Sequence, residues 1–144
     1  MPERLELSAT PEALRQVKQW LQELKGRYAL PDIIVGELNV ILEELVMNII
    51  KHAKPTPPSL GPIPVRIEAD LSDRRVMVRV MDESLPFDPL SRPKPNLSLD
   101  LNDRPIGGLG IHLVRELSDR FQYSYEQGWN VSLIEKTMHQ ENRE

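Results

Sequence analysis

Glu44 and Asn48 are the two residues whose types and spacing first suggest chemistry. They lie four positions apart in a stretch with helical periodicity, so both side chains project from one part of a helix surface. Apolar residues flank them on both sides, with Ile41 and Leu45 on one side and Met47 on the other. A carboxylate in such surroundings is costly to bury unless it has a partner or a ligand. The pair is therefore a candidate binding site.

A run of glycines provides the second candidate. Gly107, Gly108 and Gly110 stand directly before Ile111, where a helical spacing of apolar residues begins. Unpaired backbone N–H groups and the positive end of the dipole at a helix N-terminus bind phosphate groups. A tight turn is the commoner reason for glycines before a helix, so the run indicates a phosphate site only together with other signals.

Asp82 and His52 are further titratable residues at positions of interest. Asp82 continues the alternation of three valines, so a predicted strand ends in a carboxylate, for which a simple turn residue is the alternative interpretation. His52 falls within the apolar arc of its helix and is interpreted as a hydrogen-bonded core residue. Spacing also allows a metal site built from Glu44, Asn48 and His52, but no other cluster of ligands supports it.

The composition limits the classes of protein to consider. With 144 residues, 40% hydrophobic and 28% charged, the chain is predicted to form one globular domain over residues 1–144. A net charge of −4 without Lys or Arg clusters argues against nucleic acid as a partner. The absence of cysteine rules out disulfides and thiolate metal sites. No signal region or long apolar span occurs, so we expect no membrane association and, by default, a cytoplasmic location.

Periodic patterns of apolar residues predict the elements that must position these candidates. A short edge strand is expected at residues 4–8, followed by an amphipathic helix that Thr10 caps and Gly26 ends. A second helix over residues 32–54, with Asp32 as its cap, carries the carboxylate and amide pair. The candidate site is therefore arranged around the second helix.

A hairpin of two half-buried strands is predicted over residues 65–80, and Asp82 lies at its end. A long connection over about 83–106 follows, which is typical of a lid, a binding loop or disorder. The remaining elements follow in order: a helix from Ile111, a strand over residues 121–125, a strand that contains Val131 and Leu133, and a polar tail over about 137–144. This order predicts an α+β fold, a two-layer sandwich with helices on one face of a mixed, mostly antiparallel sheet.

These motifs, in their order along the chain, resemble the nucleotide site of the GHKL ATPases. The segment from Glu44 to Asn48 resembles the N-box of that superfamily, and the segments Asp82-Glu83-Ser84 and Gly107-Gly108-Leu109-Gly110 resemble its two glycine boxes. The match is closer to the histidine-kinase-like ATPase domains of anti-sigma factors, the serine-protein-kinase branch. It rests on Lys51-His52-Ala53, Pro86-Phe87-Asp88-Pro89, the run from Gly107 to Val114, and Gly128-Trp129-Asn130-Val131. The resemblance extends from about Leu7 to Lys136 and implies a sandwich of the histidine-kinase-like ATPase type.

The resemblance implies ATP and Mg²⁺ as cofactors and a role for each candidate residue. Asn48 would coordinate the Mg²⁺ that bridges the ATP phosphates, and Glu44 would orient or deprotonate the attacking hydroxyl. Asp82 would accept a hydrogen bond from the adenine amino group. The backbone of Gly108 and Gly110 would hold the phosphates, and the long connection after Asp82 would form the ATP lid.

Ser84 stands where the family has glycine in its first glycine box, among the expected ATP-binding positions. Glycine there lets the backbone pass close to the base. If Ser84 had a positive φ, the strain would be on the order of 1 kcal/mol, and ATP affinity falls about tenfold for each 1.4 kcal/mol. The loop could instead follow another path.

The leading functional hypothesis is an ATP-binding serine/threonine protein kinase that acts as an anti-sigma regulatory factor in a partner switch. The resemblance implies an antagonist protein as substrate, a sigma factor or similar regulator as second partner, and a homodimer. The alternative is a protein-binding regulatory module with a degenerate or weakened nucleotide pocket, motivated by Ser84. A purely structural domain would leave the polar residues on the second helix as an uncompensated burial cost.

Overall fold

The computed structural model describes residues 2–57, 61–91 and 108–138, and its elements follow the predicted order. The elements are β1 (Glu3–Ser8), α1 (Glu12–Tyr28), α2 (Asp32–His52), β2 (Pro64–Leu71), β3 (Arg75–Asp82), the short 3-10 helix η1 (Pro89–Ser91), α3 (Gly108–Leu117), β4 (Arg120–Glu126) and β5 (Trp129–Thr137). Most of the predicted lid and of the polar tail lies outside the described residues.

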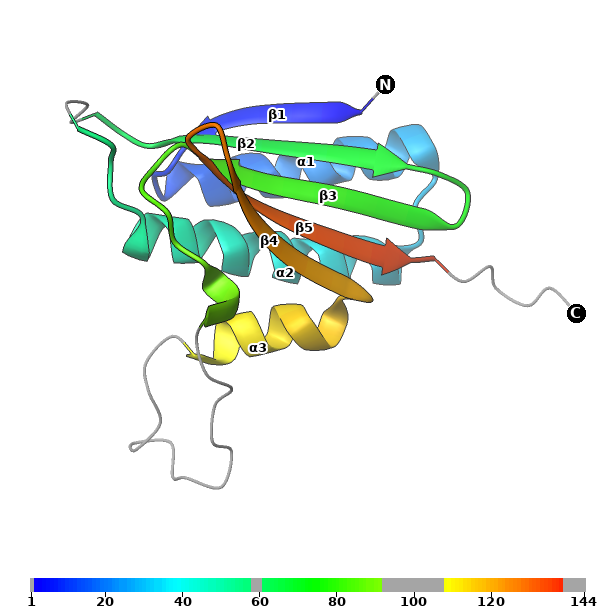
Figure 1. The fold of residues 1–144 in the computed structure, drawn as a ribbon. Coiled ribbons are helices and arrows are strands. Elements are labelled where there is room, and N and C mark those ends of the chain that lie inside the picture. Colours follow the sequence, from blue (N-terminus) through cyan, green and yellow to red (C-terminus); the bar gives the residue numbers. More distant parts are fainter. Residues whose placement is uncertain (1, 58–60, 92–107, 139–144) are drawn as a thin grey trace, which may run out of the picture.

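The strands form one sheet in the order β1-β2-β3-β5-β4. Every pairing among the described strands is antiparallel. Figure 1 shows α1 and α2 lying across one face of this sheet, with α3 below the part of the sheet formed by β5 and β4. The predicted α+β sandwich is thereby confirmed, and β1 lies at an edge as expected. The expectation of a mixed sheet is wrong for the described strands, whose pairings are all antiparallel. No described helix combines the length and the apolar character needed to cross a membrane.

The core lies between the sheet and the helices, where two periodic patterns meet. Val65, Ile67, Val78 and Val80 alternate with half-buried or exposed residues along β2 and β3 and are at most 2% exposed. They pack in one cluster with the apolar face of α2, formed by Ile34, Leu38, Ile41, Leu42, Leu45 and Ile49. Complete burial of one such side chain stabilises the fold by about 1.5–3 kcal/mol. This packing turns the rest of α2, including its polar residues, toward the border of the core.

The first helix extends past the residue that was expected to end it. α1 continues through Gly26 to Tyr28 and stops before Ala29, whose φ of 53° is left-handed. The additional turn places Tyr28 where its hydroxyl donates to the carboxylate of Glu3 in β1 at 2.6 Å. A tertiary contact therefore outweighs the weak helix preference of glycine, which costs about 1 kcal/mol.

The side-chain caps predicted for the two long helices are both absent. Pro11 occupies the cap position of α1 without a side-chain hydrogen bond, so Thr10 is not the cap. Pro31 precedes α2 in the same way, which makes Asp32 its first helical residue. Asp32 instead pairs with Lys25 of α1 at 2.5 Å. Proline suits such positions because its fixed φ is compatible with a helix start.

β5 turns a different set of residues toward the helices than its sequence suggests. Residues paired directly across two strands share a face of the sheet. Asn130 pairs with Asp82, which continues the inward alternation of β3, so the even-numbered residues of β5 face the helices. Val131 and Leu133, the apolar pair in the predicted strand, lie on the opposite face. The turn before β5 has positive φ at both Gln127 and Gly128.

Candidate functional site

Glu44 and Asn48 are half-buried on α2, next to the first turn of α3. Between the two helices lies a small pocket of about 50 Å³. It is lined by Glu44, Met47, Asn48, Lys51, His52, Gly110 and Ile111. The structure thus brings together the Glu44 and Asn48 pair and Gly110 of the glycine run, which the sequence analysis identified as two separate candidates.

Gly110 makes the close approach of the two helices possible. A Cβ added to Gly110 would lie 2.2 Å from Oε2 of Glu44 and 3.0 Å from its Cδ. The Glu44 carboxylate therefore rests against the backbone of the first turn of α3, which begins at Gly108. Free N–H groups and the positive dipole end at such a turn attract negative charge. Glycine at this position has a packing role in addition to the predicted phosphate-binding one.

Glu37, seven residues before Glu44 on α2, has a structural partner. Its carboxylate pairs with Nζ of Lys136 in β5 at 3.0 Å. Lys136, whose side chain is only 12% exposed, also donates to the carbonyl oxygen of Leu117 at the end of α3. This contact ties α2, α3 and the sheet together. Glu44 and Asn48, further along α2, line the pocket instead.

Asp82 and Ser84 form a second cluster at the end of β3, together with Asn130 of β5. Their exposed fractions are 6%, 0% and 4%. Ser84 Oγ hydrogen-bonds to Oδ2 of Asp82, and Nδ2 of Asn130 donates to the same oxygen at 3.1 Å. Burial raises the pKa of Asp82 above its ordinary value, while the hydrogen bonds from Ser84 and Asn130 oppose this shift. Asp82 is thus a desolvated carboxyl group held in one orientation.

Ser84 carries no backbone strain. Among the described residues other than glycine, positive φ occurs only at Ala29 and Gln127. The loop therefore follows a path that serine adopts readily, and the strain considered for a positive φ does not arise. The carbonyl oxygen of Ser84 accepts a hydrogen bond from the Tyr125 hydroxyl at 3.0 Å. The difference that serine makes here lies in its side chain, which fills space beside Asp82.

The segment that follows β3 joins the two clusters. Phe87 stacks on His52 at the end of α2, with ring centroids 5.5 Å apart and ring planes at 14°. The Leu85 N–H donates to the carbonyl oxygen of Lys54 at 2.9 Å. His52 is half-buried and lines the small pocket beside Asn48, so the prediction of a core histidine is wrong. It also borders a pocket of about 380 Å³, lined by His52, Lys54, Leu85, Pro86 and Phe87.

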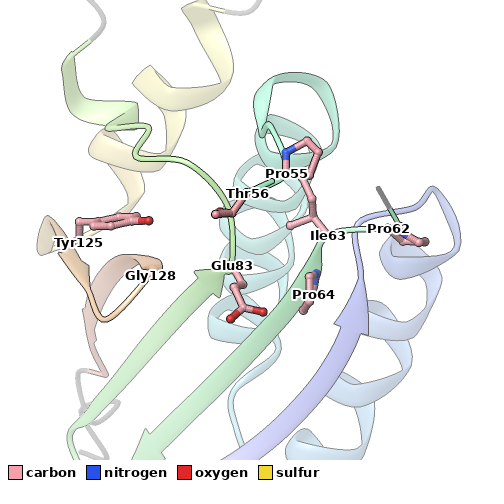
Figure 2. Close-up of a pocket in the computed structure, with 9 residues that line it drawn as sticks. Pro55, Thr56, Pro62, Ile63, Pro64, Glu83, Tyr125 and Gly128 are labelled. Atoms are coloured by element: carbon pink, nitrogen blue, oxygen red, sulfur yellow. The ribbon is translucent and has the colours of Figure 1, made fainter. Parts of the chain in front are cut away.

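A separate pocket of about 310 Å³ opens where the proline-rich segment before β2 meets the ends of β3 and β4 (Figure 2). It is lined by Pro55, Thr56, Gly61, Pro62, Ile63, Pro64, Glu83, Tyr125 and Gly128. Glu83 lines it although its neighbours Asp82 and Ser84 do not, because successive side chains at a strand end point to opposite sides. This pocket is distinct from the two clusters.

Asn130 is the residue of this site to which the sequence assigned no role. It appeared only within a string that carries the resemblance. The feature that identifies Asn130 is its position in the sheet. It pairs with Asp82, which places its amide on the helix-facing side. The apolar residues on either side of it in β5 suggested the opposite face, and only the pairing of the strands decides between the two.

The metal site considered for Glu44, Asn48 and His52 gains no additional ligands. The three side chains do line one pocket. However, over residues 2–57, 61–91 and 108–138 no group of three His, Asp or Glu side chains is placed to hold a metal ion. A cation here would need most of its ligands from a bound molecule.

Comparisons with known proteins identify the family to which this fold belongs. Residues 7–134 match the family model of the histidine kinase-like ATPase domain. The chain is 28% identical over 126 residues to the serine/threonine-protein kinase BtrW of Bordetella bronchiseptica, which covers 88% of this chain and 87% of that protein. It is also 28% identical over 131 residues to the serine-protein kinase RsbW of Listeria innocua, which covers 88% of this chain and 82% of that one.

A solved structure shows the same fold. The chain is similar to the crystal structure of the RsbU and RsbW domains of a Mycobacterium tuberculosis protein, with a TM-score of 0.64 and 18% identity. The similarity covers 94% of this chain and 32% of that one, so this chain spans about a third of the other. Because the family match runs from β1 to β5 and includes every element that builds the site, the chain belongs to the histidine kinase-like ATPase domain family.

Proposed function

We propose that this chain is an ATP-binding serine/threonine protein kinase that acts as an anti-sigma regulatory factor. The observation that carries the proposal is the meeting of Glu44, Asn48 and Gly110 at one pocket between α2 and α3. Membership of an ATPase family supports ATP as the ligand. The relatives that are named serine-protein or serine/threonine-protein kinases support transfer of phosphate to a protein hydroxyl.

The pocket suits the phosphates and Mg²⁺ of a bound nucleotide. Mg²⁺ prefers oxygen ligands and is usually bound through substrate phosphates with one or two protein groups. The side-chain oxygen of Asn48 would supply one such ligand. The backbone N–H groups of Gly108 and Gly110 would bind phosphate oxygens, and Lys51, which lines the same pocket, would add positive charge.

Glu44 would act on the attacking hydroxyl of a serine or threonine in the protein substrate. As the hydroxyl oxygen bonds to the γ-phosphorus, its proton passes to the Glu44 carboxylate and the bond to the bridging oxygen breaks, releasing ADP. The carboxylate is half-buried and rests against Gly110, which fixes its position. Most of the rate would come from positioning and charge neutralisation, because the protein forms no covalent bond itself.

Asp82 would recognise the base by accepting a hydrogen bond from the amino group of adenine. A buried carboxylate favours this role because a hydrogen bond to a charged group stabilises by about 1.5–3 kcal/mol. Ser84 lies beside Asp82 at the same site. His52, whose ring stacks on that of Phe87, lines the pocket at Asn48.

The proposed partners are an antagonist protein as substrate, a sigma factor or similar regulator, and a second copy of the chain in a homodimer. They follow from the resemblance to anti-sigma factor kinases and from the relatedness to RsbW and BtrW. A cytoplasmic location belongs to the same proposal.

A second candidate function is a protein-binding regulatory module with a weakened nucleotide pocket. The observation that favours it is the filling of space around Asp82 by the side chains of Ser84 and Asn130. In that case partner affinity would not respond to ATP. A pull-down whose strength changes with nucleotide would contradict this function.

Calorimetric titration of ATP and ADP, with and without Mg²⁺, is the first experiment. Asn48→Ala should lose most of the Mg²⁺-dependent part of the affinity. Asn39→Ala is a matched control, because Asn39 lies on the same helix and lines a different pocket, between α1 and α2. Absence of binding at millimolar nucleotide would contradict the kinase proposal.

Phosphate transfer provides the second experiment. The protein would be mixed with γ-³²P-labelled ATP, Mg²⁺ and a candidate antagonist protein. Glu44→Ala should bind ATP and remain folded but transfer no label. If the variant transfers phosphate at the original rate, Glu44 is not the base.

A further inference from the structure

Asn130 connects β5 to the end of β3 through one buried amide. The two hydrogens of its Nδ2 are shared among three acceptors: Asp82 Oδ2 at 3.1 Å, Ser84 Oγ at 3.0 Å and the carbonyl oxygen of Leu85 at 3.0 Å. Asn130 and Asp82 are directly paired across the two strands, so their side chains lie on the same face of the sheet. With Asn130 only 4% exposed, these hydrogen bonds form away from water, where they constrain orientation most strongly.

The chemistry of its neighbours decides which end of the Asn130 amide points at Asp82. The backbone N–H of Phe87, which can only donate, lies 2.8 Å from Oδ1 of Asn130. The Tyr123 hydroxyl donates to the same Oδ1. The NH₂ end must therefore face Asp82, which is an acceptor when ionised. A flipped amide would place two donors against Phe87 and an oxygen against a carboxylate.

Both donors reach the same carboxylate oxygen of Asp82. Asn130 Nδ2 and Ser84 Oγ both bond to Oδ2, and among the described residues no hydrogen bond reaches Oδ1. Rotation of the carboxylate is thereby restricted, and one oxygen remains as an acceptor in a defined direction.

Ser84 is held from a second side. The Tyr125 hydroxyl donates to its carbonyl oxygen at 3.0 Å. Figure 2 shows Tyr125 extending from β4 toward the segment that follows β3. Ser84 is thus held through both its side chain and its backbone, which places its hydroxyl beside Asp82.

We propose that Asn130 and Ser84 are positioning residues that aim Oδ1 of Asp82 at the amino group of adenine. Together they set the preference for adenine over purines that lack this group. The inference rests on the proposed function, in which Asp82 reads the base. On this inference Ser84, which stands where the family has glycine, contributes to the selection of the base and does not weaken the nucleotide pocket.

The test compares two nucleotides in calorimetric titrations with Mg²⁺ present: ATP and purine riboside triphosphate, which lacks the 6-amino group. The wild-type protein should prefer ATP by at least about tenfold, because the lost hydrogen bond involves a charged acceptor. In Asn130→Ala the preference should fall toward unity. Ser84→Ala deletes one donor to Asp82 and keeps the Cβ, so it should reduce the preference for ATP partly. It also provides a test if Asn130→Ala does not fold.

The ratio of the two affinities separates positioning from a general structural effect. Loss of structure alone would weaken both nucleotides equally and leave the ratio unchanged. Ser132→Ala is the matched control, since Ser132 lies two residues further on the same strand and face. Equal ratios in the wild type, Asn130→Ala and Ser84→Ala would overturn this inference and leave the kinase proposal intact. No ATP binding by the wild type would overturn both.

Discussion

Gly110→Ala adds one methyl group at the point where the Glu44 carboxylate rests against α3. The new Cβ would lie 2.2 Å from Oε2 of Glu44. Ordinary contacts between such atoms begin near 3.5 Å, so the oxygen must move by about 1 Å or more. The carboxylate is the flexible end of a long side chain, so we expect it to move while the backbone stays in place.

The expected effect on activity is large and the effect on stability small. A displacement of about 1 Å in a catalytic group can cost about 100-fold in rate. Alanine is preferred over glycine within a helix by up to about 1 kcal/mol. Forcing Glu44 off its preferred rotamer costs about 0.5–1.5 kcal/mol. These two contributions nearly cancel, so the free energy of unfolding should change by less than about 1 kcal/mol.

Single-turnover transfer from γ-³²P-labelled ATP to a protein substrate measures the rate, and urea unfolding measures stability. Gly36→Ala is the matched control, because Gly36 lies on α2, the helix of Glu44, and an added Cβ there meets nothing within 4 Å. It should raise stability slightly and leave transfer unchanged. The double variant Gly110→Ala with Glu44→Asp should recover part of the rate, since the shorter carboxylate avoids the methyl group.

The result that would refute this reasoning is a folded Gly110→Ala protein that transfers phosphate at the wild-type rate. Glu44 would then not be a positioned base. If both glycine variants lost activity equally, the loss would have to come from a general change in α2 or α3. The steric contact between Glu44 and Gly110 would not explain it.

Two further predictions concern stability. Lys136→Ala removes the partner of Glu37 and of the Leu117 carbonyl, and should lower the free energy of unfolding by about 1.5–3 kcal/mol in urea titrations. Arg15→Ala breaks an exposed ion pair and should change it by less than about 1 kcal/mol. If Lys136→Ala and Arg15→Ala change the free energy of unfolding equally, the contacts of Lys136 do not stabilise the fold more than an exposed ion pair does. Burial raises the pKa of Asp82 above its ordinary value of 3.8, so the folded state binds this proton more tightly than the unfolded state. The stability it contributes is complete below pH 3.8 and is lost as pH rises through the folded pKa. Urea titrations should therefore show the stability of Asp82→Asn, relative to the wild type, rising with pH over this window, and a constant difference would contradict the shift.

The order of the elements and the type of fold could be predicted because they depend on periodic burial. Alternation in β2 and β3 and the 3.6-residue stripe on α2 each occupy many residues, so a single exception does not hide them. The ends of the helices could not be predicted in this way. Gly26 and Thr10 carry local preferences of about 1 kcal/mol each. The contact between Tyr28 and Glu3 accompanies the extension of α1 past Gly26, and Pro11 takes the cap position expected for Thr10.

The residues of the candidate site also differ in whether local sequence could predict them. Glu44 and Asn48 were identified because residues four apart on one helix are neighbours whatever the rest of the chain does. The glycine run was recognised because backbone freedom is a local property. Asn130 was not assigned a role, because its contribution depends on which residue of β3 lies opposite it.

The sequence by itself therefore determined the elements, the fold class and the residues on α2 and at the start of α3 that could bind a nucleotide. Only the tertiary structure decided that Gly110 lies against Glu44, that Glu37 belongs to the scaffold, and that Ser84 and Asn130 hold Asp82. The physical reason is the range of the interactions. Periodicity and local turns are encoded within a few residues, whereas strand register and helix approach depend on how distant segments pack together.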